Sequence, residues 1–317
     1  MNGYLGVDVG SVSTKLVVVD DCLNILASIY TSTAGKPIET VQECLKRIKG
    51  DLTDEVEICG VGVTGSGREV ASVVVGADVV KNEITAHAIA ASNIIPEVNT
   101  IIEIGGQDSK IIILRDGIVV DFAMNTVCAA GTGSFLDHQA ARLGIPIEDF
   151  GALALKCEGP VRIAGRCSVF AESDMIHKQQ LGHPIESIIA GLCEALVRNY
   201  LNNVGKGKDI KPPVVFQGGV AANIGIRAAF EQALGFEVTV PENFMVMGAI
   251  GSALLARDHA RKHDKTRFKG FDASKFNYRA RSFECKSCSN LCEVIQIFQD
   301  GELVARWGGR CGRWDTL

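Results

Sequence analysis

One short pattern occurs twice in this chain of 317 residues, and it limits the fold more than any other feature of the sequence. Each copy reads as an apolar strand, a turn of glycine, serine, acid and lysine, a second strand, a tight turn and a third strand. The strands are expected at residues 4–9, 15–20 and 23–30 in the first copy, and at 100–104, 111–114 and 118–122 in the second. Because the glycine turn joins two strands, the pattern predicts a duplicated β-meander. It differs from a Rossmann unit, in which the glycine loop opens a helix.

The rest of the chain alternates helices and strands, which predicts an α/β fold of two duplicated halves. Helices are expected at residues 38–49, 133–143, 168–179, 184–203 and 247–261, and further strands at 56–63 and 213–216. We place the first half at residues 1–97, completed by the helix near 247–258, and the second half at 98–256. Residues 257–281 hold nine Lys and Arg with little periodicity and are interpreted as a basic linker. A small cysteine-rich segment follows at 282–317.

Composition and charge exclude several classes of protein. Apolar residues make up 47% and charged residues 22% of the chain, which is typical of a globular protein and not of a disordered one. The net charge of −5 argues against a general nucleic-acid binder. No apolar stretch is long enough to span a membrane, and no signal peptide precedes the first strand. We therefore expect a cytoplasmic protein whose eleven cysteines are reduced and serve metal or redox chemistry rather than disulfides.

The first glycine turn has the residues that phosphate chemistry needs. Gly10 lets backbone N–H groups approach phosphate oxygens, and the side chains of Ser11, Ser13 and Lys15 add donors. Asp8, at the end of a buried strand, is expected to hold Mg²⁺ through water and to act in catalysis. An ordinary glycine hairpin is the alternative for this turn taken alone.

Two later turns favour a nucleotide over an ordinary hairpin. In the second copy, Gly105, Gly106 and Lys110 repeat the phosphate-binding pattern, and Gln107 and Asp108 are expected to orient the attacking water or the metal. A third turn, containing Gln217, Gly218 and Gly219, would lie near the base and ribose. Each turn alone is a weak signal, whereas the three together are specific for a nucleotide polyphosphate.

Two cysteines stand directly before predicted helices. Cys128 precedes the helix at 133–143, and Cys167 precedes the helix at 168–179. A thiolate, or the negative charge of a metal–thiolate group, is stabilised at a helix N-terminus by the helix dipole and by free N–H groups. From the residues alone, two buried core cysteines are the alternative. Five other cysteines lie in apolar or helical runs and are expected to have no role: Cys22, Cys44, Cys59, Cys157 and Cys193.

The last segment carries four cysteines with the spacing C-x₂-C-x₃-C-x₁₈-C. They are Cys285, Cys288, Cys292 and Cys311. Such a set predicts a closed Cys₄ site for Zn²⁺ or for a second [4Fe–4S] cluster, and residues 294–298 and 303–307 predict a hairpin around Asp300-Gly301. So small a unit has too little core to fold without a staple. The alternative is a redox-sensitive tail that is partly disordered.

Several of these motifs together resemble one family. They are residues 6–11, 64–68, 82–88, 103–110, 125–136, 165–170 and 217–223. Over residues 3–256 the chain is similar to the ATP-dependent activators of 2-hydroxyacyl-CoA dehydratases and benzoyl-CoA reductases, including reductases of double-cubane-cluster proteins. This family lies within the actin, sugar kinase and heat-shock chaperone ATPase superfamily. The family often has a cysteine where this chain has Ala86, beside His87, which is expected to be a packed or interface histidine.

The resemblance implies a fold and a set of cofactors. Two domains like those of actin and ribonuclease H would enclose a nucleotide cleft that binds ATP or ADP with Mg²⁺, and Gly131, Thr132 and Gly133 would join the nucleotide contacts. A homodimer would hold one [4Fe–4S] cluster, with Cys128 and Cys167 supplied by each subunit. The shorter family members lack the C-terminal cysteine segment.

The resemblance also implies an activity. ATP hydrolysis would drive low-potential one-electron transfer from the shared cluster to a partner iron–sulfur protein, either a double-cubane-cluster protein or a dehydratase. Ferredoxin or flavodoxin would supply the electron. Two alternatives remain open from the sequence: a small-molecule kinase of the same superfamily, and a non-enzymatic metal-binding regulator.

Overall fold

The computed structural model describes residues 1–125, 127–263 and 265–315. Residues 126, 264, 316 and 317, which fall in the predicted cysteine motif, linker and tail, lie outside the described residues. The chain forms two compact units. Unit 1 contains Met1–Ala86 and the chain from Gly248 onward, and unit 2 contains His87–Met247.

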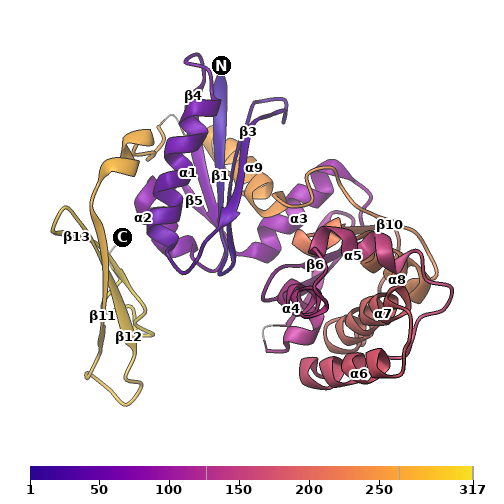
Figure 1. The fold of residues 1–317 in the computed structure, drawn as a ribbon. Helices are drawn as coiled ribbons and strands as arrows, with labels where there is room; N and C mark the ends of the chain where they lie inside the picture. Colours follow the sequence, from indigo (N-terminus) through magenta and orange to yellow (C-terminus); the bar gives the residue numbers. More distant parts are fainter. Residues whose placement is uncertain (126, 264, 316–317) are drawn as a thin grey trace. The chain divides into compact units, whose positions relative to one another are not determined.

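Unit 1 is built on a five-stranded sheet with the order β3-β2-β1-β4-β5 (Figure 1). The strands are β1 (Asn2–Val9), β2 (Ser13–Val19), β3 (Ile25–Ser32), β4 (Glu57–Thr64) and β5 (Val79–Val80). The first three strands form the predicted antiparallel meander, and β4 runs parallel to β1. The helices of this unit are α1 (Pro37–Asp51) and α2 (Arg68–Val75), together with the start of α3 (Glu83–Ile94) and nearly all of α9 (Met247–Ala260).

The two faces of the unit 1 sheet receive different side chains because successive residues of a strand point to opposite faces. Leu5 and Val7 are fully buried in a core shared with α1 and α2. On the other face, Gly6 and Gly62 allow the backbone of α9 to lie directly on the sheet. A Cβ atom at Gly62 would stand 2.0 Å from the Ser252 carbonyl oxygen. Small residues at these strand positions therefore determine how closely α9 packs.

Unit 2 repeats this topology. Its sheet has the order β10-β9-β6-β7-β8, so each strand corresponds to the strand five places earlier in the chain. The strands are β6 (Thr100–Ile104), β7 (Ser109–Arg115), β8 (Ile118–Asn125), β9 (Val214–Gln217) and β10 (Val238–Thr239). The helices are η1 (Ala129–Gly131), α4 (Gly133–Leu143), α5 (Ile147–Ala154), α6 (Ser168–Gln180), α7 (Ile185–Asn203), η2 (Gly219–Ala222) and α8 (Ile224–Leu234). The predicted α/β class with two duplicated halves is confirmed.

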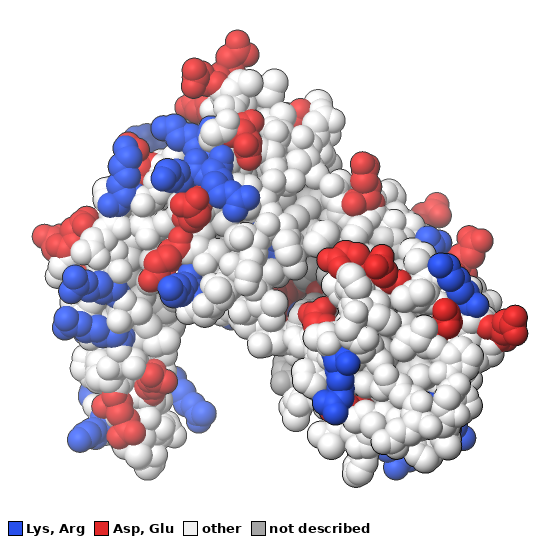
Figure 2. Space-filling view, viewed as in Figure 1, with Lys and Arg blue, Asp and Glu red and all other residues white. Residues whose placement is uncertain are grey.

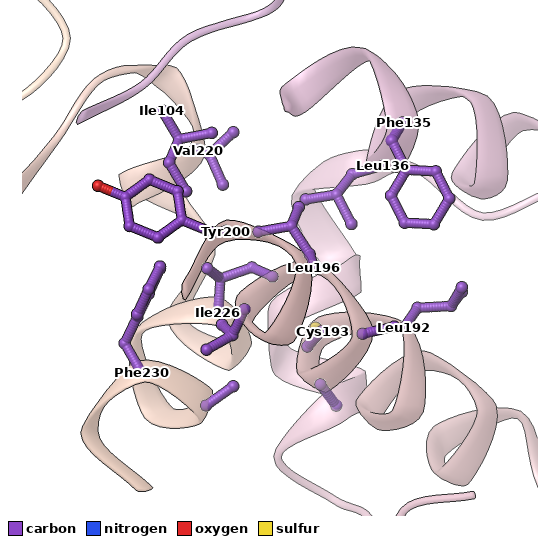
Figure 3. Close-up of a cluster of buried hydrophobic side chains, with 14 of the residues drawn as sticks. Ile104, Phe135, Leu136, Leu192, Cys193, Leu196, Tyr200, Val220, Ile226 and Phe230 are labelled. Carbon is purple, nitrogen blue, oxygen red and sulfur yellow. The ribbon is translucent and has the colours of Figure 1, made fainter. Parts of the chain in front are cut away.

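The unit 2 core is centred on aromatic side chains from α7, α8 and β9 (Figure 3). The ring of Phe230 meets the rings of Tyr200 and Phe216 at centroid distances of 5.3 Å, in edge-to-face geometry. The Tyr200 hydroxyl donates a hydrogen bond of 2.7 Å to the Lys110 carbonyl, so this buried phenol is satisfied. That bond ties α7 to strand β7, which carries one of the predicted phosphate-binding lysines.

The C-terminal residues form a third, small sheet with the order β11-β12-β13. It contains β11 (Tyr278–Glu284), β12 (Glu293–Gln299) and β13 (Glu302–Trp307), and a short helix, η3 (Phe271–Lys275), precedes it. The predicted hairpin is present as β12 and β13. Strand β11 was missed, because its alternating arginines resemble a charged linker.

The described residues of the basic segment 257–281 belong to unit 1 and contact its helices α1 and α2. Residues 257–260 complete α9. The Gln42 side chain of α1 donates hydrogen bonds to the carbonyls of Ala273 and Phe276, at 3.1 and 2.8 Å. The Tyr278 hydroxyl donates to the Val74 carbonyl of α2 at 3.2 Å. The domain bounds expected from the sequence otherwise stay predictions.

None of the helices formed by the described residues has both the length and the apolar character required to cross a bilayer.

The close packing of α9 can be tested with one added methyl group. We expect Gly62→Ala to lower the free energy of unfolding by about 1–3 kcal/mol or more, because the new Cβ would overlap the backbone of α9. Gly50→Ala is the matched control. Gly50 lies in the last turn of α1 with no atom near its Cβ position, so alanine there should stabilise the helix slightly. Urea unfolding of both variants measures the difference, and equal midpoints would contradict this account of the packing.

Candidate functional site

The first predicted phosphate loop is the turn between β1 and β2. Asp8 and Lys15 are direct partners in the β1–β2 register, and the Lys15 ammonium lies 3.1 Å from Asp8 Oδ2. The Gly10 amide closes the turn by donating to the Ser13 carbonyl at 2.9 Å. Ser11 is exposed, whereas Ser13 is buried. The structure therefore brings the predicted acid and the predicted phosphate-binding cation into one ion pair.

Two glycines that the sequence analysis gave no role make room around Asp8. Gly65 follows β4 with φ +97°, and a Cβ atom there would lie 2.7 Å from Asp8 Oδ1. Gly248, in the first turn of α9, is equally close to Asp8 Oδ2, at 2.8 Å. The neighbouring Thr64 hydroxyl is buried with no hydrogen-bond partner among the described residues. The Thr64-Gly65 turn was visible in the sequence, but Gly248 is brought to Asp8 only by the packing of α9.

The second predicted loop, in unit 2, repeats the geometry of the first. Glu103 and Lys110 are register partners in β6 and β7, and Lys110 Nζ lies 3.0 Å from Glu103 Oε2. The same ammonium lies 2.8 Å from Asp108 Oδ2. The Gly105 amide donates to the Asp108 carbonyl at 3.0 Å, as Gly10 does in unit 1. Glu103, which the sequence analysis gave no role, is thus the counterpart of Asp8.

Burial separates the members of this second loop. The Lys110 side chain is 3% exposed and its ion pairs lie inside the protein, whereas a third of the Asp108 side chain is exposed. Gln107 lies at the surface of the turn. Asp108 and Gln107 are therefore accessible to a ligand, and Lys110 positions Asp108 from within.

Two further predicted segments converge on the same turn of unit 2. The Gly133 and Ser134 amides, at the start of α4, donate to the Gly105 and Gly106 carbonyls at 2.8 and 2.9 Å. Gly218 has φ +88°, and a Cβ atom there would stand 2.4 Å from the Ile104 carbonyl oxygen. The turns at 105–110, 131–134 and 217–219 therefore form one local cluster.

Gln217 lies at the centre of this cluster and contacts His87. It pairs with Glu103 in the β6–β9 register and is fully buried. Its Nε2 atom lies 2.7 Å from Nδ1 of His87, which is itself buried. The Gln217 Oε1 atom is buried with no hydrogen-bond partner among the described residues. His87 is thus a packed histidine that orients a residue of the predicted nucleotide site.

The structure brings the Cys128 and Cys167 loops together in unit 2. Cys128 directly precedes η1, and Cys167 directly precedes α6 in extended conformation. Cys128 Sγ lies 3.8 Å from the Arg166 carbonyl oxygen, one residue before Cys167. Both thiols are partly exposed. The two helix starts therefore present their thiols at the surface of the same region.

Two asparagines that sequence reasoning missed hold these loops. Asn199 of α7 donates to the Gly165 carbonyl at 2.6 Å, and its Nδ2 atom lies 3.7 Å from Cys128 Sγ. The Asn125 carboxamide accepts from the Cys128 amide at 2.9 Å and donates to the Cys128 carbonyl at 2.8 Å. Asn199 is distant in sequence from both cysteines, so no local pattern could have found it.

An exposed apolar surface adjoins the cysteine loops in sequence. Every second residue of the edge strand β8 is apolar, and these four side chains are between 42% and 67% exposed. Beyond the strand, the residues beside the two cysteines are also apolar and exposed. The β8 face is defined here as Ile118, Val120, Phe122 and Met124, and Val127, Val169 and Phe170 are the exposed apolar residues near the two cysteines in sequence. Exposed apolar patches of this kind mark interaction surfaces.

Cys44 and Cys193 are buried, unlike the partly exposed Cys128 and Cys167. Loss of hydration raises the pKa of the Cys44 thiol to about 11 and that of Cys193 to about 12. Both stay protonated at neutral pH, so neither is a ready metal ligand.

Within residues 1–125, 127–263 and 265–315, no three His, Cys, Asp or Glu side chains are gathered to hold a metal ion. The Cys128–Cys167 pair fits half of a Cys₄ site, because each chain supplies two accessible thiols.

A comparison with protein-family models identifies residues 5–256 as matching the BadF/BadG/BcrA/BcrD ATPase family. The chain belongs to this family. It is 37% identical to the (R)-2-hydroxyglutaryl-CoA dehydratase activating ATPase of Acidaminococcus fermentans, over 81% of this chain and 98% of that protein. It is 36% identical to the 2-hydroxyisocaproyl-CoA dehydratase activator of Clostridioides difficile, over 82% of this chain and 97% of the relative. The resemblance expected from the motifs is confirmed.

Solved structures support the same assignment. The activator of the 2-hydroxyisocaproyl-CoA dehydratase from Clostridium difficile, solved with bound ADPNP, matches with a TM-score of 0.73 and 35% identity, over 82% of this chain and 96% of that chain. Component A of the Acidaminococcus fermentans (R)-2-hydroxyglutaryl-CoA dehydratase also matches with a TM-score of 0.73 and 35% identity, over 82% of this chain and the whole of that chain. This ATPase thus shares its fold with dehydratase activators, and the C-terminal sheet lies beyond the family match.

The buried ion pairs in unit 2 predict a large stability effect. We expect Lys110→Met to lower the free energy of unfolding by about 3–5 kcal/mol, because it leaves the Glu103 carboxylate buried without its cation. Lys275→Met is the matched control, because its partner Asp272 is exposed and the pair is screened by water. Denaturant unfolding compares the two. Equal losses of stability would contradict the assignment of Lys110 as a buried structural cation.

Proposed function

We propose that this chain hydrolyses ATP and uses it to drive low-potential one-electron transfer to a partner iron–sulfur protein. One observation carries the proposal: a member of this ATPase family has two partly exposed cysteines on adjoining loops, and the helix that follows the first of them is hydrogen-bonded through its backbone to the glycine turn at Gly105 and Gly106. Relatives with this architecture are named as activators of acyl-CoA dehydratases. The partner we propose is a dehydratase or a double-cubane-cluster protein, with ferredoxin or flavodoxin as the electron donor.

The acid–lysine turns are proposed to bind the nucleotide. Gly10, Ser11 and Lys15 in unit 1 would bind phosphate oxygens, and Asp8 would hold Mg²⁺ through water. In unit 2, Gly105 and Gly106 would approach phosphate through their backbone. Further contacts are proposed for Ser13, Lys110, Gly131, Thr132, Gly133, Gln217, Gly218 and Gly219. A relative of the same fold has been solved with bound ADPNP, which supports a nucleotide here.

Asp108 and Gln107 are the proposed residues for positioning water. Asp108 is partly exposed, and Lys110 holds its carboxylate in place at 2.8 Å. Gln107 is exposed next to it and offers a neutral donor and acceptor. Hydrolysis of a phosphoanhydride depends mainly on positioning and on electrostatic stabilisation, which these residues could provide.

The thiols of Cys128 and Cys167 are the proposed ligands of a [4Fe–4S] cluster shared by two copies of the chain. Two cysteines cannot complete a four-thiolate site, whereas a two-fold axis doubles them. The N–H groups at the starts of η1 and α6 favour the negative charge of bound thiolates. When bound, the cluster would supply one electron to the partner protein.

Backbone hydrogen bonds provide a route from nucleotide to thiol within unit 2. Gly133 and Ser134 donate to the Gly105 and Gly106 carbonyls, and only η1 and Thr132 separate Gly133 from Cys128. A phosphate bound at the glycine turn would therefore shift the start of α4 and, with it, the Cys128 loop. Raising one electron by ~400 mV requires roughly 9 kcal/mol, which is the scale of work proposed for the nucleotide.

The proposed nucleotide chemistry predicts a loss of turnover on removing the Asp8 charge. We expect Asp8→Asn to lower kcat for ATP hydrolysis by about a hundredfold or more, as is typical when a positioned charge or base is lost. Asp272→Asn, an exposed carboxylate of the same unit, should leave the rate unchanged. Phosphate release is the measurement, and unchanged release by Asp8→Asn would contradict the role. A phosphorylated small alcohol would instead indicate a kinase.

The shared cluster predicts a metal stoichiometry. The wild-type protein, purified without oxygen, should contain four iron and four sulfide per dimer at the Cys128–Cys167 site. Cys128→Ala should remove this iron and the electron transfer while nucleotide still binds. Cys22→Ala is the control, because Cys22 is an exposed thiol in a surface turn. Normal electron transfer by Cys128→Ala and Cys167→Ala would overturn the proposal.

The β8 face is the proposed homodimer contact around the cysteines. Because a symmetric interface uses the same surface from both copies, Phe122→Asp would place two charges in it. We expect this variant to sediment as a monomer and to lose iron. Ile224→Asp is the control, because Ile224 is 47% exposed in the same unit but lies outside the β8 face. A Phe122→Asp protein that dimerises as tightly as wild type would exclude this face.

A further inference from the structure

The C-terminal sheet holds a cysteine cluster that the nucleotide site does not use. The family match ends at residue 256, whereas the four cysteines lie between residues 285 and 311. Three of them lie on the single loop that joins β11 to β12, and the fourth follows β13. The family match therefore assigns these four cysteines no function, and the geometry of the C-terminal sheet shows which of them lie close together.

Backbone hydrogen bonds shape the first three cysteines into one compact loop. The Cys285 amide donates to the Cys292 carbonyl at 2.7 Å and extends the β11–β12 ladder by one pair beyond Glu284 and Glu293. Inside the loop, the Leu291 amide donates to the Cys288 carbonyl at 3.3 Å. The loop therefore turns back on itself between its first and last cysteine, so that both flank the end of the same ladder.

Residues on both sides of the fourth cysteine, Cys311, contact this loop. Gly308, three residues before Cys311, lies so close to the loop that a Cβ atom would stand 2.4 Å from the Glu293 carbonyl oxygen, next to Cys292. Trp314, three residues after Cys311, places its indole Nε1 3.1 Å from Cys285 Sγ. The short segment with Cys311 is thus held against both ends of the cysteine loop.

Side-chain contacts fix the Trp314 end of this segment. The indole ring packs edge-on against Phe283 at a centroid distance of 5.2 Å and lies under the Arg306 guanidinium at 5.0 Å. The Arg313 guanidinium donates to the Ser287 hydroxyl, inside the cysteine loop, at 2.8 Å. These contacts come from β11, β13 and the loop. Several interactions therefore hold the segment with Cys311 and Trp314 against the cysteine loop.

Charge around the four sulfurs is suited to bound thiolates. Four thiolates and one divalent cation carry a net charge of −2, and Lys286, Arg310 and Arg313 are direct or near sequence neighbours of the cysteines. The Trp314 indole N–H, 3.1 Å from Cys285 Sγ, is placed to donate to a thiolate there. Figure 2 shows side chains of both signs over the tail sheet, at the lower left where Figure 1 draws β11–β13.

We propose that Cys285, Cys288, Cys292 and Cys311 bind one Zn²⁺ ion, with Trp314 as a second layer that donates to the Cys285 thiolate. The spacings of two and three residues in the loop lie within the range of structural zinc sites. Among the described residues, no three of these sulfur atoms lie close enough together to coordinate one ion. Cys288 and Cys311 are exposed, so side-chain rotation and a small loop movement bring them in without unpacking a core.

The bound ion would stabilise the loop end of the C-terminal sheet, where few apolar side chains are buried. Ile297 and Ala305 are buried in the core shared with α1 and α2, whereas Val294 and Cys285 are the buried apolar residues described near the loop end. A sheet of this size is marginal without a metal or a covalent link. Metal binding would then couple to the folding of the loop, because the ligands are assembled only in the folded sheet.

The test uses the full-length chain, purified without oxygen, with zinc, iron and sulfide measured per chain. We expect one zinc per chain in the wild type and its loss in the double variant Cys288→Ser/Cys311→Ser, which alters only exposed cysteines. Cys22→Ser is the matched control and should keep the zinc. Zinc content that is equal in the double variant and wild type, or iron and sulfide at these four cysteines in place of zinc, would overturn the proposal.

A second measurement does not depend on how well the variant folds. In the wild-type protein, the four tail thiols should be protected from a thiol-specific colorimetric reagent until a chelator removes the zinc, and four additional thiols per chain should then react. Immediate reaction of the four tail thiols before chelation, in addition to thiols such as that of Cys22, would overturn the proposal. Cys128→Ala should lose the shared iron and keep the zinc, so failure of the proposed electron transfer and failure of this site give different results.

Discussion

The structure depends on a charged pair repeated across the first turn of each β-meander. In unit 1 the pair is Asp8 and Lys15, and in unit 2 it is Glu103 and Lys110, each in direct register across two antiparallel strands. A buried lysine needs its carboxylate partner, since either charge alone would be costly to keep from water. The pair therefore fixes the end of the first strand and the shape of the glycine turn in both units. The repetition of this geometry supports a common origin for the two units and a common ligand chemistry.

The function proposed for unit 2 depends on how the glycine turn is joined to the cysteine loops. The start of α4 donates two backbone hydrogen bonds to the turn, and Asn199 joins the loops of Cys128 and Cys167 from α7. The glycine turn and the thiol loops are thus connected by backbone hydrogen bonds and by one buried asparagine side chain. This arrangement suits an ATPase that has to alter the environment of a thiol-bound group. The tail sheet is a separate addition, packed on α1 and α2 through Gln42 and Tyr278.

Much of the fold was predictable from local pattern. The two meanders, the β12–β13 hairpin and the helices α1, α4, α6, α7 and α9 follow from apolar periodicity and turn residues, which act over a few neighbours, whereas α2, α3, α5 and α8 were missed. Strand β11 was missed because two arginines, Arg279 and Arg281, hide its alternation, and the segment before it was interpreted as a linker. The family could also be named from motifs, because glycine turns and cysteines before helices are contiguous in the sequence. The role of Glu103 was missed, since an acid in an apolar strand shows its partner only in the register of β6 and β7.

By itself, the sequence determined the duplicated α/β architecture, the family and the residue types available for phosphate and metal binding. Only the tertiary structure decided that Gly248 lies against Asp8, that Gln217 contacts His87, and that Asn199 lies between two cysteine loops. It also decided that Trp314 returns to Cys285. Each of these is a contact between residues far apart in the chain. Such contacts are determined by how helices and strands pack, which depends on the shape of many side chains at once, whereas a motif records only what neighbouring residues have in common.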